Sequence, residues 1–214
     1  MEAGTRFDLI YETMPWHKVD TVVFDIGNVL VRYEPKEIVR ELFPGDEAKQ
    51  AHMVEVVYNG PQWQEIDRGT IDFHGAAEMF HRQHGYPVED YLHALFSSFD
   101  LKEPIEEGWR AVVRCKRAGK HLYLLSNYGS EGYTRMRARL ADRFANFEGD
   151  CISAHYHQLK PEPEIYQTLI DKFSIDPQRT LFIDDSLANI EGANRMGIHG
   201  FHQHEKGQLD RFFI

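Results

Sequence analysis

Cysteine is scarce in this sequence: Cys115 and Cys151 are the only two among 214 residues, and they are far apart without a Cys-x-x-Cys spacing. This favours a reduced, cytoplasmic protein over one held together by disulfides. Long apolar runs are also missing, since none approaches the roughly 20 residues that cross a bilayer. The first residues include Glu2, Arg6 and Asp8 rather than an apolar signal core, so we expect neither secretion nor membrane insertion.

Positive charge is sparse relative to negative charge. The chain has 24 Lys and Arg against 34 Asp and Glu, which gives a formal net charge of −10 at pH 7. Nucleic acids and anionic membrane surfaces bind basic patches, so we expect neither as a partner. With 42% hydrophobic and 27% charged residues, the composition is that of a soluble globular protein with one sizeable core and room for a smaller helical appendage.

The order of the apolar segments predicts an α/β protein with a helical insertion. An apolar, β-branched run at residues 21–31 is typical of a strand buried on both faces. Residues 35–100 then show helical periodicity without strand-like alternation. From about residue 104, helices alternate with short buried strands, which requires right-handed crossovers and a parallel sheet. These strands are predicted at 121–125, 151–153, 180–183 and 198–201.

We therefore predict a Rossmann-like, doubly wound parallel sheet with a small all-helical cap domain. Residues 19–33 and 104–214 form the α/β core, and residues 34–103 form the cap. Residues 1–18 are an N-terminal extension, expected to hold a short surface helix that ends at Pro15. The large apolar side chains of the cap are expected to pack mainly in its own core, and they include Trp63, Phe73, Met79, Phe80, Tyr91 and Phe96.

Polar side chains follow four of the predicted strands or their loops. Each alone has an ordinary explanation as a loop carboxylate, a turn or helix cap, or a solvated lysine. Open parallel sheets, however, bring the carboxyl ends of neighbouring strands into one crevice. That crevice would hold three carboxylates, a hydroxyl, an amide and an ammonium group. The residues are Asp25, Ser126, Asn127, Lys160, Asp184 and Asp185.

Carboxylates gathered in one crevice repel each other, so a hard cation is implied. Mg²⁺ is favoured because it takes oxygen ligands and leaves room for a phosphate. The hydroxyl and the lysine suit a phosphate dianion. An aspartate fixed beside Mg²⁺ and phosphate can act as a nucleophile and form an aspartyl-phosphate.

Four motifs in this order resemble those of the haloacid dehalogenase (HAD) superfamily. The resemblance covers residues 20–33 and about 104–202, and the helical block lies where members of that superfamily carry a helical cap. The first motif is most similar to the branch that includes sugar-phosphate phosphatases such as glucose-1-phosphate phosphatase. The motifs are Asp25 with Asn28-Val29-Leu30, Ser126-Asn127, Lys160-Pro161 through Tyr166, and Phe182 through Ser186 with Asn189, Gly192, Ala193 and Gly197.

The resemblance implies a role for each motif residue. Asp25 would be the nucleophile, with Ser126 and Lys160 as further catalytic residues. Ser126, Asn127 and Lys160 would bind the phosphoryl group. Mg²⁺ would be held by Asp25, the backbone carbonyl of Gly27, Asp185 and Asp184. The expected activity is Mg²⁺-dependent hydrolysis of a small phosphorylated metabolite, with a sugar phosphate as the expected class, by a monomer or weak dimer.

Gly27 departs from the pattern, because most phosphatases of this family carry there an aspartate that protonates the leaving group. General acid catalysis typically contributes about 10²–10⁴-fold. Glu34, His155 and His157 lie near motifs in the sequence and are candidates for a substitute acid. An alternative is a catalytically weak or inactive phosphate-binding or regulatory protein.

Two further alternatives fit the sequence less well. A 2-haloacid dehalogenase needs no leaving-group acid, but it has no use for the acidic pair Asp184-Asp185. A receiver-type signalling domain has its acidic pair early in the chain, opposite to the order here.

The spacing of His155 with His157, and of His202 with His204, is compatible with a transition metal. With 12 histidines such pairs arise by chance, and we expect no metal there.

Overall fold

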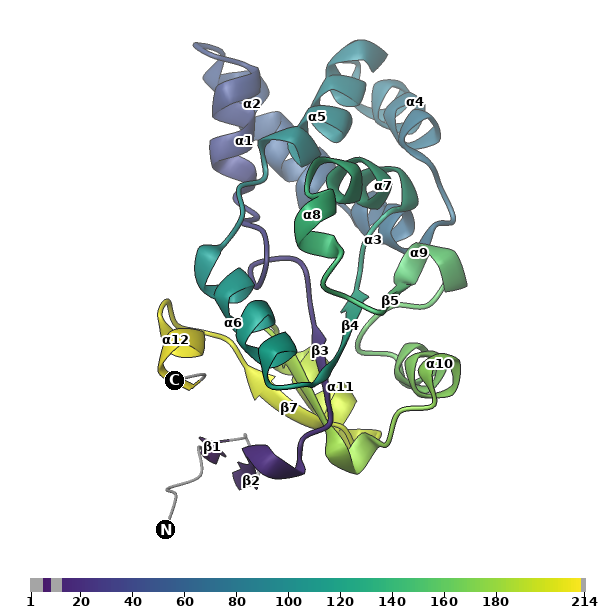
Figure 1. Cartoon of the computed structure of the whole chain (residues 1–214). Coiled ribbons are helices and arrows are strands. Elements are labelled where there is room, and N and C mark those ends of the chain that lie inside the picture. The colour runs from purple at the N-terminus through teal and green to yellow at the C-terminus, as the bar shows by residue number, and fades with distance from the viewer. Residues whose placement is uncertain (1–5, 9–12, 213–214) are drawn as a thin grey trace.

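The computed structural model describes residues 6–8 and 13–212 (Figure 1). A five-stranded parallel sheet forms the core, in the order β5-β4-β3-β6-β7. Its central strand pairs with both neighbours, and its last residue, Phe24, lies opposite Leu124 and Ile183. The predicted fold class is confirmed. The strands are β3 (Thr21–Phe24), β4 (His121–Ser126), β5 (Gly149–Ile152), β6 (Thr180–Asp184) and β7 (His199–His202).

Alternate side chains of the strands enter two separate cores, one on each face of the sheet. Val22 and Phe24 pack into one core with Trp109 of α6, and Val23 packs into the other with Ile165 of α10. Helices on both faces bury strands β3 and β6 along their whole length, as in doubly wound folds. The core helices are α6 (Glu106–Arg117), α7 (Ser130–Arg139), α8 (Ala141–Phe144), α9 (Ser153–Tyr156), α10 (Pro163–Phe173), α11 (Leu187–Arg195) and α12 (Gln208–Phe212).

The segment between β3 and α6 is helical and lies beyond the carboxyl end of the sheet (Figure 1). Its core is continuous with the core on the α6 face. The cap boundaries at 34 and 103 stay a prediction, and all five α-helices of the segment fall within them. They are α1 (Pro35–Leu42), α2 (Glu47–Met53), α3 (Pro61–Arg68), α4 (Phe73–His84) and α5 (Val88–Leu101), with a π-helical turn at Val54–Tyr58 after α2.

The predicted strand at 21–31 is too long. β3 ends at Phe24, and the backbone then folds into turns in which the N–H groups of Leu30 and Val31 both donate to the Ile26 carbonyl. Asn28 adopts a left-handed conformation with φ 52°. Apolar residues in this turn are buried like strand residues, which explains why the hydrophobic pattern extended the strand past its end.

The N-terminal extension also differs from the prediction. Instead of a helix that ends at Pro15, β1 (Arg6–Asp8) pairs antiparallel with β2 (Thr13–Pro15), followed by a 3₁₀-helix at Trp16–Lys18. Residues 1–5 and 9–12 of that predicted segment lie outside the described residues. Both cysteines are buried and free. In the part of the chain that the structure describes, no helix is long and apolar enough to cross a membrane.

Helix α6 fixes the turn that follows β3. The Leu30 carbonyl accepts hydrogen bonds of 2.8 Å from the Ile105 N–H and from the indole N–H of Trp109. Between them, Gly108 lets the helix approach so closely that a Cβ there would lie 2.0 Å from the Val29 carbonyl oxygen. Close packing of this helix thus holds the segment directly after Asp25.

Gly108→Ala is expected to lower the free energy of unfolding by about 1–3 kcal/mol, because the added methyl group must displace backbone. Val113→Ala, on the exposed side of the same helix, should change it by less than about 0.5 kcal/mol. Urea unfolding of both variants measures the difference. Equal stability of Gly108→Ala and the wild type would contradict the close approach.

Candidate active site

The first motif places Asp25 directly after β3, with its backbone N–H donating to the Ile183 carbonyl at 2.9 Å. Its side chain is buried at the carboxyl end of the sheet. The left-handed turn that follows directs Asn28 to Asp185, whose Oδ2 accepts a hydrogen bond of 2.9 Å from Asn28 Nδ2. Asn28 Oδ1 accepts a hydrogen bond from the Tyr33 N–H. Asn28 therefore ties the first motif to the fourth.

Lys160 lies between two carboxylates. Its Nζ is 2.8 Å from Asp25 Oδ1 and 2.6 Å from Asp184 Oδ2, and all three side chains are buried. Burial disfavours the ammonium charge, but the carboxylates of Asp184 and Asp25 outweigh it and raise the pKa of Lys160. Lys160 is therefore a permanent cation beside the predicted nucleophile.

Asn127 holds the backbone of the lysine loop. Its Nδ2 donates to the Lys160 carbonyl at 3.0 Å, and its Oδ1 accepts from the Lys160 N–H at 2.8 Å. Both ends of the amide thus orient Lys160. The predicted contact of Asn127 with a phosphoryl group stays a prediction.

The two aspartates of the fourth motif have different surroundings. Asp184 is fully buried, and its carboxylate accepts hydrogen bonds from Lys160, from the Ser186 N–H and from the amide of Asn189. Asp185 is half-buried and reaches the cavity described below. Asp184 is thus bound mainly to protein donors, whereas Asp185 is more accessible to a ligand.

Asp25, Asp184 and Asp185 form a cluster in which one oxygen of each lies within 4.8 Å of the others. Burial raises the pKa of Asp25 to about 7; Lys160 opposes this rise, and the nearby Asp184 and Asp185 add to it. Burial also raises the pKa of Asp185. Although Lys160 Nζ is close to it, the buried Asp25 Oδ1 has no donor in hydrogen-bonding geometry.

These features fit a hard divalent cation. It would supply the positive charge that the cluster needs beyond Lys160 and would satisfy the buried oxygen of Asp25. The carboxylates of Asp25 and Asp185 line the cavity described in the next paragraph, and Gly27 also lies in its wall. All-oxygen ligands of this kind suit Mg²⁺.

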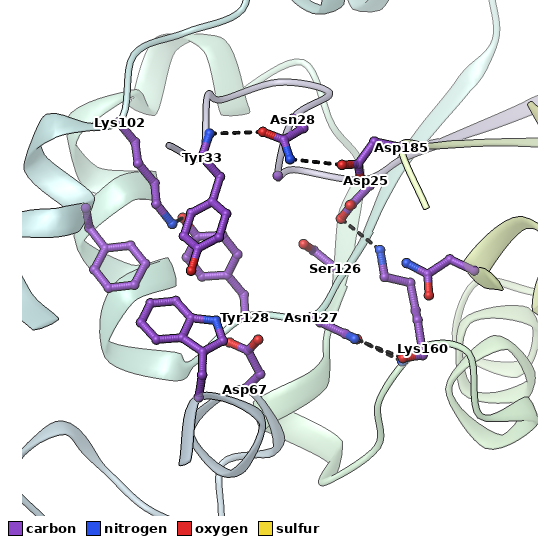
Figure 2. A pocket seen from close by; sticks show the side chains of 14 residues that line it. Asp25, Asn28, Tyr33, Asp67, Lys102, Ser126, Asn127, Tyr128, Lys160 and Asp185 are labelled. Carbon is purple, nitrogen blue, oxygen red and sulfur yellow. Dashed lines mark hydrogen bonds and ion pairs between the residues drawn. The ribbon is translucent and has the colours of Figure 1, made fainter. Parts of the chain in front are cut away.

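A cavity of about 190 Å³ opens over the cluster, between the sheet and the helical segment (Figure 2). The labelled Ser126 lies between Asp25 and the aromatic side chains on the opposite wall (Figure 2). The core contributes Asp25, Gly27, Asn28, Ser126, Asn127, Tyr128, Lys160, Asp185 and Asn189, and the segment between β3 and α6 contributes Tyr33, Trp63, Asp67, Phe99 and Lys102.

Every predicted site residue except Asp184 lines this cavity, and Asp184 lies beneath it in contact with Lys160. The structure thus brings the predicted residues together, while their individual roles stay predictions. The proposed substitute acids lie elsewhere. Glu34 is exposed and lines a neighbouring hollow that shares Asn28 and Asp185 with the cavity, and His155 and His157 are exposed outside the cavity.

The rings of His202 and His204 both lie near backbone carbonyls. The ring of His202 lies 2.9 Å from the Asp185 carbonyl through Nε2, and His204 Nδ1 lies 3.0 Å from the His202 carbonyl. Within the described residues, the acidic cluster of Asp25, Asp184 and Asp185 is where potential metal ligands converge in a group of three or more.

The sequence patterns did not reveal the cap residues of the cavity. Trp63 was expected in the cap core but lines the cavity, whereas Phe73, Phe80 and Tyr91 are buried in the core as expected. Asp67 was not singled out at all. Apart from its position one helical turn after Trp63, the sequence carries no signal that distinguishes Asp67 from a surface carboxylate.

Lys102 was also missed. It is buried, its Nζ donates to the Tyr128 hydroxyl at 3.0 Å, and it lies 4.3 Å from the centre of the Phe99 ring. Burial lowers the pKa of Lys102 to about 7, although Asp67 opposes this effect. A lysine at the end of a helix is usually solvated, so only the packed structure identifies this one.

Comparison with known proteins identifies the family. Residues 19–197 match the haloacid dehalogenase-like hydrolase family. The chain belongs to this family. Its relatives include the sesquiterpene phosphatase astK of Aspergillus oryzae, 23% identical over 84% of this chain and 87% of that protein. The D-ribitol-5-phosphate phosphatase of Bacteroides thetaiotaomicron is 25% identical over 88% of this chain and 93% of that protein.

Solved structures share the fold of this hydrolase. A HAD family enzyme of Bacteroides thetaiotaomicron, bt-2542, was crystallised as an Asp-to-Ala mutant with magnesium and inorganic phosphate. It superposes with a TM-score of 0.71 at 20% identity, over 89% of this chain and 98% of that chain. The L-2-haloacid dehalogenase of Xanthobacter autotrophicus has a TM-score of 0.63 at 17% identity, over 90% of this chain and 81% of that chain.

Mg²⁺ is expected to stabilise the wild-type hydrolase against heat, by about 2.7 kcal/mol at a concentration 100 times Kd. Asp185→Asn removes a predicted metal ligand and should abolish this stabilisation. It should not destabilise the metal-free protein, because it also removes a charge from a crowded acidic cluster. Thermal unfolding with Mg²⁺ and with EDTA measures both effects.

The control is Asp171→Asn, an exposed carboxylate on α10, which should keep the full response to Mg²⁺. An unchanged Mg²⁺ response in Asp185→Asn would contradict the assigned site.

Proposed function

We propose that this hydrolase is a Mg²⁺-dependent phosphatase that cleaves a small phosphomonoester through an aspartyl-phosphate on Asp25. The observation that carries the proposal is the position of Asp25. Its carboxylate lies at the floor of the cavity, 2.8 Å from the Lys160 ammonium and within the acidic cluster. A nucleophile, a fixed countercharge and a cation site thus converge on one reacting position, which is what phosphoryl transfer requires.

The side chains divide the chemistry among them. Asp25 attacks the phosphorus atom, and the leaving-group oxygen departs with the electron pair of the bond that breaks. Lys160 orients the nucleophile and offsets negative charge, and the Ser126 hydroxyl donates a hydrogen bond to a phosphoryl oxygen. Mg²⁺, held by Asp25, Asp185 and the Gly27 carbonyl, would supply Lewis-acid charge stabilisation. Water then hydrolyses the aspartyl-phosphate and regenerates Asp25.

A small, hydroxylated leaving group such as a sugar or polyol suits the cavity best. Its volume of about 190 Å³ is below the range of about 300–1,000 Å³ that is usual for drug-sized ligands. Its cap wall combines the rings of Trp63 and Phe99 with two polar side chains, Asp67 and Lys102. These polar groups favour a leaving group that offers hydroxyl groups over a purely hydrocarbon one. The ribitol-phosphate phosphatase among the relatives is consistent with this class.

We further expect a monomer or weak dimer, because one chain supplies every residue of the site. The two free, buried cysteines are consistent with a cytoplasmic location. Structural similarity to a haloacid dehalogenase raises that activity as a second candidate. The acidic cluster weighs against it, because halide displacement by Asp25 has no use for a cation site. Chloride release from 2-chloropropionate in the presence of EDTA would favour the dehalogenase.

The proposal predicts Mg²⁺-dependent hydrolysis of p-nitrophenyl phosphate. Asp25→Asn should lower kcat by more than about 10³-fold, because a neutral amide is a poor nucleophile. EDTA should abolish turnover, and Mg²⁺ should restore it. Asp171→Asn serves again as the matched control and should keep wild-type activity.

Steady-state assays across a panel of sugar, polyol and other metabolite phosphates complete the test. No turnover of any of them would favour a phosphate-binding protein instead. Full activity of Asp25→Asn would exclude Asp25 as the nucleophile.

A further inference from the structure

The first motif leaves the leaving group without a proton donor. Gly27 has no side chain, and a Cβ built there would meet nothing within 4 Å, so no neighbouring side chain fills its place. A sugar or polyol alkoxide is a poor leaving group, and a general acid contributes about 10²–10⁴-fold to such a step. A donor must therefore come from another part of the cavity wall if such substrates are to be cleaved efficiently.

We propose that Asp67, on the cap helix α3, is this general acid, and that it then serves as the base that activates water. The proposal rests on the phosphatase function proposed above. Asp67 lines the same cavity as Asp25 and Ser126. In Figure 2 its carboxyl group points into the cavity from the cap side, across from Asp25. A leaving group that departs from a phosphoryl group on Asp25 would thus move toward Asp67.

The end of α3 is docked firmly on the core, so Asp67 has a defined place relative to Asp25. The Ser153 hydroxyl donates to the Asp67 carbonyl at 2.5 Å. The neighbouring Arg68 forms an ion pair of 2.5 Å with Glu162, next to the lysine loop. These contacts join the Asp67 carbonyl and the next side chain along the helix to the α/β core.

Two glycines bring the helix into this position. Gly69 ends α3 in a left-handed conformation with φ 74°, and a Cβ there would lie 2.5 Å from the Ala154 carbonyl oxygen. On the core side, a Cβ on Gly129 would lie 2.7 Å from Ile66 Cγ2. Such close approach leaves little freedom for α3 to move away from the site.

The surroundings of Asp67 suit an acid that works near neutral pH. Burial raises the pKa of Asp67 to about 7; the Lys102 ammonium and the Gly129 N–H oppose this rise, Asp25 adds to it, and Lys160 opposes it. Below about pH 7 the carboxyl group is protonated and can donate, and above it the group is ionised and can accept. An acid with a pKa near the working pH is the most effective.

Other titratable groups in the cavity wall near Asp67 are less suitable. The phenols of Tyr33 and Tyr128 have pKa values raised by burial and by Asp67 itself, so they hold their protons more tightly. Lys102 Nζ donates to the Tyr128 hydroxyl and lies over aromatic rings. Lys102 is better placed to tune Asp67 than to replace it.

Asp67 gives up one proton and regains one in each turnover. Protonated Asp67 gives its proton to the leaving-group oxygen as the P–O bond breaks and Asp25 gains the phosphoryl group. Asp67 is then ionised, and it takes a proton from the water that attacks the phosphorus atom of the aspartyl-phosphate. Inorganic phosphate is released, and Asp25 and protonated Asp67 are restored.

The test compares Asp67→Asn with the wild type on two substrates in the presence of Mg²⁺. On an alkyl phosphate that the wild type cleaves, such as a polyol phosphate, kcat/KM should fall by about 10²–10⁴-fold. On p-nitrophenyl phosphate, whose leaving group needs no proton, kcat/KM should stay within about tenfold. Because water activation is also slowed, a burst of p-nitrophenolate should precede the steady state.

Glu65→Gln provides the matched control, because Glu65 is an exposed carboxylate on the same helix. Glu65→Gln should leave kcat/KM unchanged for both substrates. Asp67→Glu keeps the acid and should recover part of the alkyl phosphate activity. Equal losses of kcat/KM on both substrates, or no loss on either, would overturn the role of Asp67. Absence of p-nitrophenyl phosphate turnover in the wild type would instead overturn the proposed function.

The pH profile gives a second, independent readout on wild-type enzyme. For the alkyl phosphate, kcat/KM should fall as the pH rises through about 7, because the proton donor is lost. For p-nitrophenyl phosphate this fall should be absent. Lys102→Met removes a cation that favours the ionised carboxylate, so it should shift the fall to higher pH. A fall of the same size with both substrates would contradict the proposal.

Discussion

The site depends on two buried ion pairs of the Lys160 ammonium group, one with Asp25 and one with Asp184. A lysine without partners would be too costly to bury, and here it is stabilised by Asp25 on one side and Asp184 on the other. The two aspartates follow or end adjacent strands, β3 and β6, which pair in register. Asn127, after β4 on the other side of β3, holds the backbone of the lysine loop. The order of the parallel strands therefore determines which charges meet.

This arrangement divides the work between the two parts of the chain. The sheet supplies Asp25, which is the proposed nucleophile, its countercharge and the acidic cluster, all close to the carboxyl ends of strands. The helical segment supplies the wall that faces the leaving group, with Asp67 and Lys102 among its rings. Because α3 is docked on the core through Ser153 and Glu162, the two walls form one site rather than two independent surfaces.

The sequence predicts the chemistry of the sheet better than that of the helical segment. Asp25, Lys160 and Asp185 follow strands or their loops, where a parallel sheet brings polar residues together, so local patterns were sufficient. Asp67 and Lys102 acquire their properties from burial between helices, which no local pattern encodes. The same limit explains the overlong first strand, since buried turn residues and buried strand residues have the same composition. The N-terminal hairpin was missed because its strands are only three residues each.

Covalent capture of the phosphorylated enzyme tests the central claim, nucleophilic attack by Asp25, most directly. A reaction with Mg²⁺ and a substrate that the enzyme cleaves rapidly would be quenched in acid during turnover, digested and analysed by mass spectrometry. We expect a phosphoryl group on the peptide that contains Asp25, and hydroxylamine should remove it, as expected for an acyl phosphate. A phosphoryl group on another residue would contradict it. So would inversion of configuration at a chiral phosphorus atom, since two displacements must give retention.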